Sequence, residues 1–117
     1  MHDVTSPEYI GPGVWRVIHS IARRADTDFK EDRAIEMIWE LIDTFPCEKC
    51  AQDGRDHWKR DNIFNYIGER DRLGIFRWTV NFHNTVNLKL NKKMMDYDIA
   101  LSLYDDDAMC SLKSCSV

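Results

Sequence analysis

Two cysteines separated by two residues, Cys47 and Cys50, are the side chains of this sequence best suited to chemistry. Two thiols at this spacing can close a disulfide within one helical turn, and the same spacing also suits a pair of zinc ligands. Pro46 comes directly before them and favours the first position of a helix, because its fixed φ suits that position. A helix that begins at Pro46 places Cys47 at its N-terminus, where the helix dipole stabilises a thiolate. The pair therefore indicates either redox exchange or metal binding.

The composition of the 117 residues is that of one ordinary globular domain. Hydrophobic residues make up 44% and charged residues 31% of the chain. The formal net charge of −4 shows no excess of basic residues of the kind that binds nucleic acid, so we expect no nucleic-acid partner. No apolar run approaches the roughly 20 residues of a membrane span, and the first residues resemble neither a signal nor a transit peptide. We therefore expect no membrane segment and no targeting segment.

Apolar residues recur at helical spacing in four stretches, which predicts an all-α fold. The four expected helices cover about residues 14–24, 28–45, 46–60 and 75–91. A loop ending in Gly11-Pro12-Gly13 precedes the first, and residues 61–74 are expected to form a loop with one helical turn. Asp96 can cap a short fifth helix that contains Tyr104. No stretch alternates strongly enough to build a sheet, which argues against a thioredoxin-like reductase.

Polar residues interrupt the apolar face of the stretch 75–91. Steps of three and four residues place His83 and Asn87 among core positions, with Asn84 beside them. A buried polar group without a partner costs about 1–3 kcal/mol, so these side chains either satisfy one another or bind something. A polar, aromatic-rich ligand docked against Trp15 and Trp78 explains the cluster better.

Three further features each have a structural and a functional explanation. Trp15 and His19 are four residues apart and share one side of the first helix, either as core residues or beside a ligand. Lys92 follows the helix over 75–91, where it either balances the helix dipole or holds an anion such as a phosphate. Cys110 and Cys115 lie in a polar tail that offers a thiol no packing role, so they are either inert tail thiols or a redox pair.

Three blocks of this sequence, in order, resemble the Erv/ALR family of FAD-dependent sulfhydryl oxidases. They are Gly11-x-x-x-Trp15-x-x-x-His19, then Pro46-Cys47-x-x-Cys50, then Trp78-x-x-x-x-His83-Asn84-x-Val86-Asn87-x-x-Leu90-x-Lys92 followed by Tyr104. The resemblance covers roughly residues 11–104. The short length of this chain is similar to that of the family members encoded by large cytoplasmic DNA viruses.

The resemblance implies a four-helix bundle with a short fifth helix, FAD at the mouth of the bundle, and usually a homodimer. It implies that incoming protein thiols attack Cys47, that Cys50 lies next to the flavin, and that O2 is reduced to hydrogen peroxide. The cofactor-binding residues that it implies are Gly11, Trp15, His19, Trp78, His83, Asn84, Val86, Asn87, Leu90, Lys92 and Tyr104, with no metal ligand.

The resemblance also divides the chain into an oxidase domain, residues 1–104, and a flexible tail, residues 105–117. Some family members carry a shuttle disulfide on a terminal arm, and we expect Cys110 and Cys115 to form one here. Cellular members commonly carry a further cysteine pair where this chain has Val80 and Tyr97, so bound FAD is expected to contribute more of the stability.

The expected partners are thiol-containing proteins, a thioredoxin-like carrier among them. The expected location is the host cytoplasm or the virion if the chain is viral, with the mitochondrial intermembrane space as the alternative. A competing hypothesis from another class is a zinc-stabilised helical binding module, with Cys47, Cys50, Cys110 and Cys115 as thiolate ligands.

Overall fold

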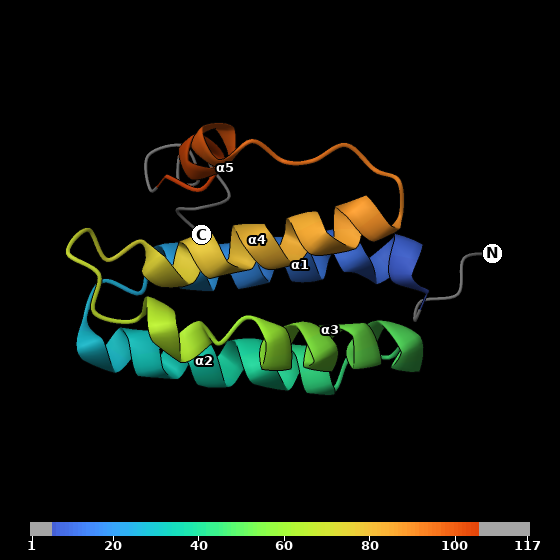
Figure 1. Cartoon of the computed structure of the whole chain (residues 1–117), viewed down its shortest axis with the longest axis horizontal. Helices are drawn as coiled ribbons and strands as arrows, with labels where there is room; N and C mark the ends of the chain where they lie inside the picture. The colour runs from blue at the N-terminus through green and yellow to red at the C-terminus, as the bar shows by residue number, and fades with distance from the viewer. Residues whose placement is uncertain (1–5, 106–117) are drawn as a thin grey trace, which may run out of the picture.

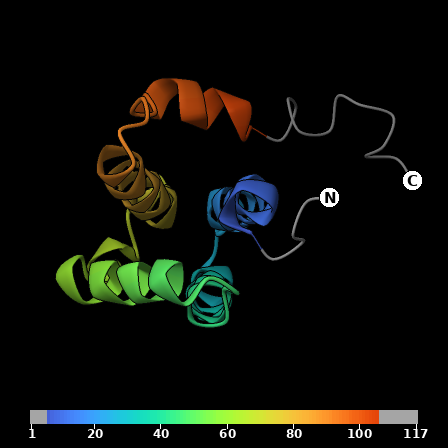
Figure 2. The ribbon, with the colours of Figure 1, turned by 90° about the vertical axis from the view of Figure 1, so that its right-hand side faces the viewer.

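The structure is a computed structural model that describes residues 6–105. Its helices are α1 (Pro7–Arg23), α2 (Asp28–Asp43), α3 (Glu48–Arg60), the short 3-10 helix η1 (Ile63–Tyr66), α4 (Gly74–Lys89) and α5 (Tyr97–Leu103). Helices α1 to α4 run alternately in opposite directions, and α5 lies outside them across the bundle (Figures 1 and 2). The described part of the chain contains no strand, so the predicted all-α fold is confirmed there.

The core is aliphatic around α2 and aromatic along α4. Ile38 of α2 is fully buried, as are Phe76 and Trp78 of α4. Trp78 keeps its polar atom satisfied, because its indole Nε1 donates a hydrogen bond of 2.7 Å to the carbonyl oxygen of Asp61. Ala22 of α1 has no exposed surface, and its small side chain lets α1 lie close to its neighbours.

Helix α1 begins earlier than the sequence pattern predicted. The expected loop ending in Gly11-Pro12-Gly13 is wrong, because α1 starts at Pro7 and includes Pro12 in its interior. Pro7 suits the first helical position, whereas Pro12 removes one backbone donor and would ordinarily end a helix. Tertiary packing overrides this local penalty. The added turns extend α1 to the end of the bundle where α3 begins and α4 ends (Figure 1).

The corner between α2 and α3 differs slightly from the prediction. Helix α2 ends at Asp43 rather than Phe45, and α3 begins at Glu48 rather than Pro46, which lies in a bend between them. Cys47 is the N-cap of α3, and its Sγ accepts a hydrogen bond of 3.2 Å from the amide of Cys50. A sulfur cap satisfies one of the unpaired amides of the first turn, so the helix can start after the proline instead of at it.

Arg55 holds this corner in place. Its guanidinium donates to Asp43 Oδ1 at 2.9 Å, to the Asp43 carbonyl oxygen at 3.2 Å and to Glu48 Oε1 at 2.9 Å. One side chain thus joins the last turn of α2 to the first turn of α3, the turn that carries the cysteine pair.

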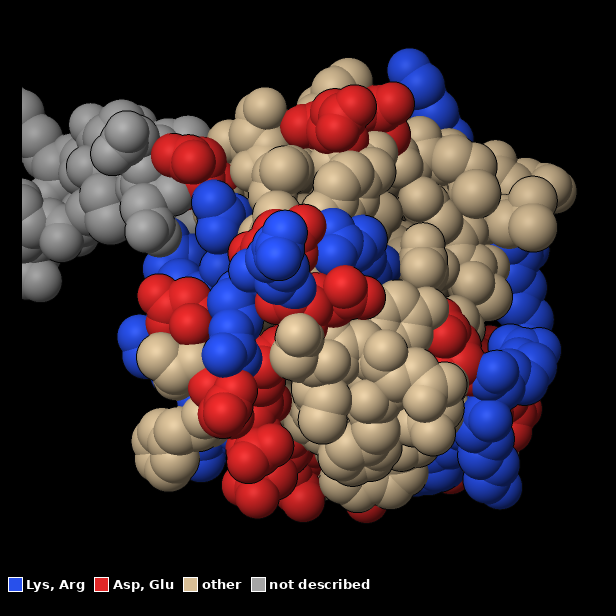
Figure 3. Space-filling view, turned by 60° about the vertical axis from the view of Figure 1, so that its left-hand side comes forward, with Lys and Arg blue, Asp and Glu red and all other residues tan. Residues whose placement is uncertain are grey.

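Charged side chains of both signs are interspersed on the face shown in Figure 3. The ion pairs of the described residues include Arg72–Asp28, at 2.7 Å, and Arg77–Asp71, at 3.0 Å. Among the helices of residues 6–105, none has both the length and the apolar character needed to cross a bilayer.

Candidate active site

Cys47 and Cys50 form a disulfide, with their Cα atoms 5.2 Å apart. Both residues are half-buried. An oxidised pair offers no thiolate for the zinc site of the competing hypothesis, and its other two ligands, Cys110 and Cys115, lie outside the described residues. Within residues 6–105 no group of three or more His, Cys, Asp or Glu side chains is arranged to hold a metal ion.

A cavity of about 640 Å³ opens at the end of the bundle where the disulfide lies. This volume is within the range of roughly 300–1,000 Å³ that is typical of small-molecule sites. Its apolar wall is formed by side chains from α1, α2, the α2–α3 corner and α4: Val14, Trp15, Ile18, Leu41, Ile42, Phe45, Phe82 and Val86. Cys50 is part of the lining, whereas Cys47 is not.

Most of the predicted cofactor-binding residues line this cavity. They are Gly11, Trp15, His83, Val86, Asn87, Leu90, Lys92 and Tyr104. Continued in steps of three and four, the inward face of residues 75–91 also predicts a buried Leu90. This prediction is wrong, because α4 ends at Lys89 and Leu90 is 56% exposed.

Three of the predicted cofactor-binding residues, His19, Trp78 and Asn84, do not line the cavity. His19 and Trp78 have no exposed surface. Asn84 is bound to the backbone of Met95, accepting from its amide at 2.6 Å and donating to its carbonyl oxygen at 2.9 Å. Asn84 thereby fixes the segment that leads from α4 to α5, which is how this structure uses its polar side chain.

The two histidines of the site contact each other directly. Nε2 of His19 lies 2.9 Å from Nδ1 of His83, and the indole of Trp15 stacks on the His83 ring at 4.0 Å between centroids. Asn87, only 8% exposed, donates a long hydrogen bond of 3.4 Å to Asn84 Oδ1. The polar cluster is therefore partly self-satisfied, and His83 and Asn87 still line the cavity.

The two histidines of the site are neutral at pH 7, and its positive charge comes from other side chains. Burial, with a further contribution from His83, lowers the pKa of His19 to about 3. Burial, followed by the nearby charge of Lys92, lowers the pKa of His83 to about 4, so both imidazoles are neutral at pH 7. Positive charge comes instead from Arg16, Lys89 and Lys92.

The sequence analysis missed Arg16 and Lys89. Glu8, Pro12 and Arg16 recur at steps of four residues, which places them along one face of α1 beside the cavity. Glu8 and Pro12 lie outside the helix predicted over residues 14–24, so the sequence pattern did not show that they share this face with Arg16. Lys89 was missed because its place depends on a distant partner, Asp53.

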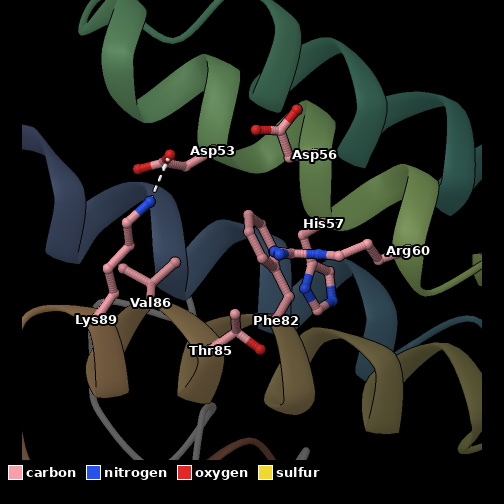
Figure 4. A pocket seen from close by; sticks show the side chains of 8 residues that line it. All are labelled: Asp53, Asp56, His57, Arg60, Phe82, Thr85, Val86 and Lys89. Atoms are coloured by element: carbon pink, nitrogen blue, oxygen red, sulfur yellow. Dashed lines mark hydrogen bonds and ion pairs between the residues drawn. The ribbon is translucent and has the colours of Figure 1, made fainter.

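A smaller cavity of about 60 Å³ adjoins the larger one between α3 and α4. Asp53, Phe82, Val86 and Lys89 line both. Figure 4 shows Lys89 reaching from α4 to Asp53 of α3, at 2.7 Å, and the ring of His57 beside Phe82, with centroids 5.0 Å apart. These contacts hold the helix that carries Cys50 against the helix that carries His83.

We expect the folded chain to lose stability as the pH falls from 7 to 5. His19 and His83 have pKa values below the ordinary 6.5, so the unfolded chain binds protons that the folded chain excludes. The stability is complete above pH 6.5 and decreases until the folded pKa values, about 3 and about 4, are reached. One pKa unit corresponds to about 1.4 kcal/mol, so the fully buried His19 alone removes roughly 2 kcal/mol by pH 5.

Urea unfolding at a series of pH values measures this loss. A His19→Asn variant should show a shallower dependence between pH 7 and 5, because one of the two titrations is gone. A midpoint that stays constant over this interval in the parent chain would contradict the assignment of both imidazoles as neutral.

Comparisons with known proteins show the family to which this chain belongs. The family model described as Erv1 / Alr family matches residues 12–106. The FAD-linked sulfhydryl oxidase of African swine fever virus (isolate Pig/Kenya/KEN-50/1950) is 27% identical over 111 residues, covering 88% of this chain and 86% of that protein.

Two further relatives come from a virus and from yeast. The putative FAD-linked sulfhydryl oxidase 088R of Frog virus 3 (isolate Goorha) is 30% identical over 107 residues, covering 86% of this chain and 69% of that protein. The mitochondrial FAD-linked sulfhydryl oxidase ERV1 of Saccharomyces cerevisiae is 30% identical over 97 residues, covering 80% of this chain and 49% of that protein. The family match and the cysteine geometry lead to one conclusion: this chain belongs to the Erv1 / Alr family.

Proposed function

We propose that this chain is an FAD-linked sulfhydryl oxidase that forms disulfide bonds in protein thiols. The observation that carries the proposal is the asymmetry of the Cys47–Cys50 disulfide, of which only Cys50 lines the large cavity. Cys47 is half-buried outside that lining, where a thiol of another protein can approach it. The names of the relatives, FAD-linked sulfhydryl oxidases, support both the cofactor and the thiol substrate.

The cavity fits FAD in size and in chemistry. Its volume of about 640 Å³ suits a large ligand, and the faces and edges of Trp15 and Phe82 suit planar rings. Lys89 is paired with Asp53 at 2.7 Å, so Arg16 and Lys92 are the cations suited to a diphosphate. When bound here, FAD supplies a two-electron acceptor beside Cys50.

Thiol exchange follows from the position of each sulfur. A substrate thiolate attacks Sγ of Cys47, the Cys47–Cys50 bond breaks, and Cys50 leaves as a thiolate. A second substrate thiol then attacks the mixed disulfide, which releases the substrate disulfide and Cys47 as a thiol. Two substrate thiols thereby lose two electrons, which the enzyme passes through Cys50 toward the cavity. The amide of Cys50 and the N-terminus of α3 stabilise negative charge on Cys47 during exchange.

Oxygen is the final acceptor in this proposal, and one O2 is reduced to one hydrogen peroxide for each disulfide formed. The purified chain should be yellow, with absorbance near roughly 450 nm, as expected of an oxidised flavin. It should consume oxygen with dithiothreitol and produce peroxide in equal amounts. A colourless protein that takes up no FAD on refolding would refute the proposal.

A shuttle disulfide between Cys110 and Cys115 belongs to the same proposal, although both residues lie outside the described part of the chain. A tethered pair makes its exchange with Cys47–Cys50 intramolecular, at an effective concentration on the order of millimolar for a short flexible linker. We expect a Cys110→Ser/Cys115→Ser double variant to oxidise a reduced protein several-fold more slowly and dithiothreitol at the parent rate. Oxygen uptake with both substrates measures this. Equal rates with the protein substrate would leave the tail without a shuttle role.

A homodimer and a thioredoxin-like carrier remain predictions of this proposal. Because several relatives are viral proteins, the host cytoplasm or the virion is the proposed place of action. The mitochondrial intermembrane space is the alternative, and the yeast relative is named as a mitochondrial protein.

A further inference from the structure

Three polar side chains form a row that ends at the large cavity. Thr79 of α4 and His19 of α1 have no exposed surface, and His83 of α4 lines the cavity. Oγ1 of Thr79 lies 3.0 Å from Nδ1 of His19, and Nε2 of His19 lies 2.9 Å from Nδ1 of His83. Each distance is a hydrogen bond, so one proton must lie in each gap.

The direction of the first bond is set by the backbone. Oγ1 of Thr79 also lies 2.7 Å from the carbonyl oxygen of Phe76, which can only accept a hydrogen bond. The single hydroxyl proton must therefore point at that carbonyl. Oγ1 is then an acceptor toward His19, and Nδ1 of His19 must carry the proton.

The second direction follows from the first. A neutral imidazole carries one proton, so His19 protonated on Nδ1 presents a lone pair on Nε2. Nδ1 of His83 must donate to that lone pair, which leaves Nε2 of His83 unprotonated. The stacked indole of Trp15, inclined by only 6° to the His83 ring, holds the ring in this orientation. Among residues 6–105 no hydrogen bond is made to Nε2 of His83.

We infer that Thr79 is a positioning residue that acts through His19 to fix the tautomer of His83, so that His83 offers the cavity a hydrogen-bond acceptor. The ligand group that meets this nitrogen must therefore be a donor, such as a hydroxyl or an amino group. A phosphate oxygen is excluded from this position and belongs with the cations Arg16 and Lys92. That the ligand is FAD, which carries hydroxyl and amino donors, rests on the proposed function, whereas the tautomer does not.

Nitrogen-15 spectra of the histidine rings in the full chain test the inference directly, because protonated and unprotonated ring nitrogens have different shifts. We expect His19 and His83 both to be protonated on Nδ1. Thr79→Val keeps the shape of the side chain and removes its oxygen. It should release His19 and give His83 a mixture of tautomers. FAD should then bind about tenfold more weakly, the effect of about one lost hydrogen bond.

Two variants serve as controls. Thr85→Val removes a hydroxyl from the same helix that donates to the Asn81 carbonyl oxygen at 2.9 Å, but it contacts neither histidine. It should leave the tautomers and the affinity unchanged. Thr79→Ser retains the oxygen and should restore both readouts.

The inference is overturned if His83 is protonated on Nε2 in the parent chain. It is equally overturned if Thr79→Val leaves the nitrogen-15 shifts of both histidines at their parent values. These spectra can be read with or without flavin, so a chain that took up no FAD would refute the proposed function while the tautomer result stood.

Discussion

Cys50→Ser is expected to retain FAD and to lose oxygen consumption by roughly a thousandfold or more, even with small dithiols. Serine cannot form the disulfide that a substrate thiolate attacks, and it cannot accept electrons at the cavity wall where Cys50 lies. The cofactor should remain, because Cys50 is one of many residues in the lining and the wall around it is unchanged. Oxygen uptake and flavin absorbance of the same sample measure the two properties together.

Cys47→Ser is the matched variant, because it removes the same cross-link but leaves the other sulfur. An oxidised protein substrate distinguishes the two. In Cys50→Ser the thiolate of Cys47 can attack a substrate disulfide, which gives a mixed disulfide and releases one substrate thiol. The mixed disulfide accumulates, because no Cys50 thiol is present to resolve it. Cys47→Ser should form little of this adduct, because its remaining sulfur lies at the cavity wall. Equal adduct yields, or retained oxygen uptake in Cys50→Ser, would contradict the assigned roles.

The elements of this fold were predictable where local patterns decide them. Apolar spacing located the four main helices, and Thr27 and Asp96 cap α2 and α5 with side-chain hydrogen bonds, as their types suggest. The start of α1 was not predictable, because Gly11-Pro12-Gly13 breaks the local signal and only contacts with distant segments outweigh it. That error concealed Glu8 and Pro12, which line the cavity from the part of α1 that was predicted to be a loop.

The site was predictable as a set of residues but not as an arrangement. The polar positions His83 and Asn87 on an apolar helix face indicated a ligand, and both line the cavity. Their partners could not be deduced, because His19 lies 64 positions from His83 in the sequence. Thr79 resembles any threonine in a helix until the structure places its hydroxyl between a carbonyl oxygen and an imidazole.

Removal of FAD is expected to lower the melting temperature by about 15 °C. The cavity of about 640 Å³ is large for a chain of 117 residues, and side chains from α1, α2, α3 and α4 line it. Within residues 6–105 the single disulfide closes a loop with a sequence separation of 3, which constrains the unfolded chain little. A ligand present at about 1,000 times its Kd stabilises the folded state by about 4 kcal/mol, and about 1 kcal/mol shifts the Tm of a domain of this size by about 4 °C.

Two tryptophans allow a controlled test of this effect. Trp15→Ala removes a wall of the cavity and the ring that stacks on His83, so added FAD should raise its melting temperature by only a few degrees. Trp39→Ala removes a partly buried ring that packs on Trp58, with centroids 4.9 Å apart, and does not line the cavity. Its melting temperature should fall equally with and without FAD, so that the gain from FAD is preserved. Thermal scans at fixed protein concentration and several FAD concentrations measure both. If FAD raised the melting temperature of Trp15→Ala as much as that of the parent, the flavin would lie elsewhere in the chain.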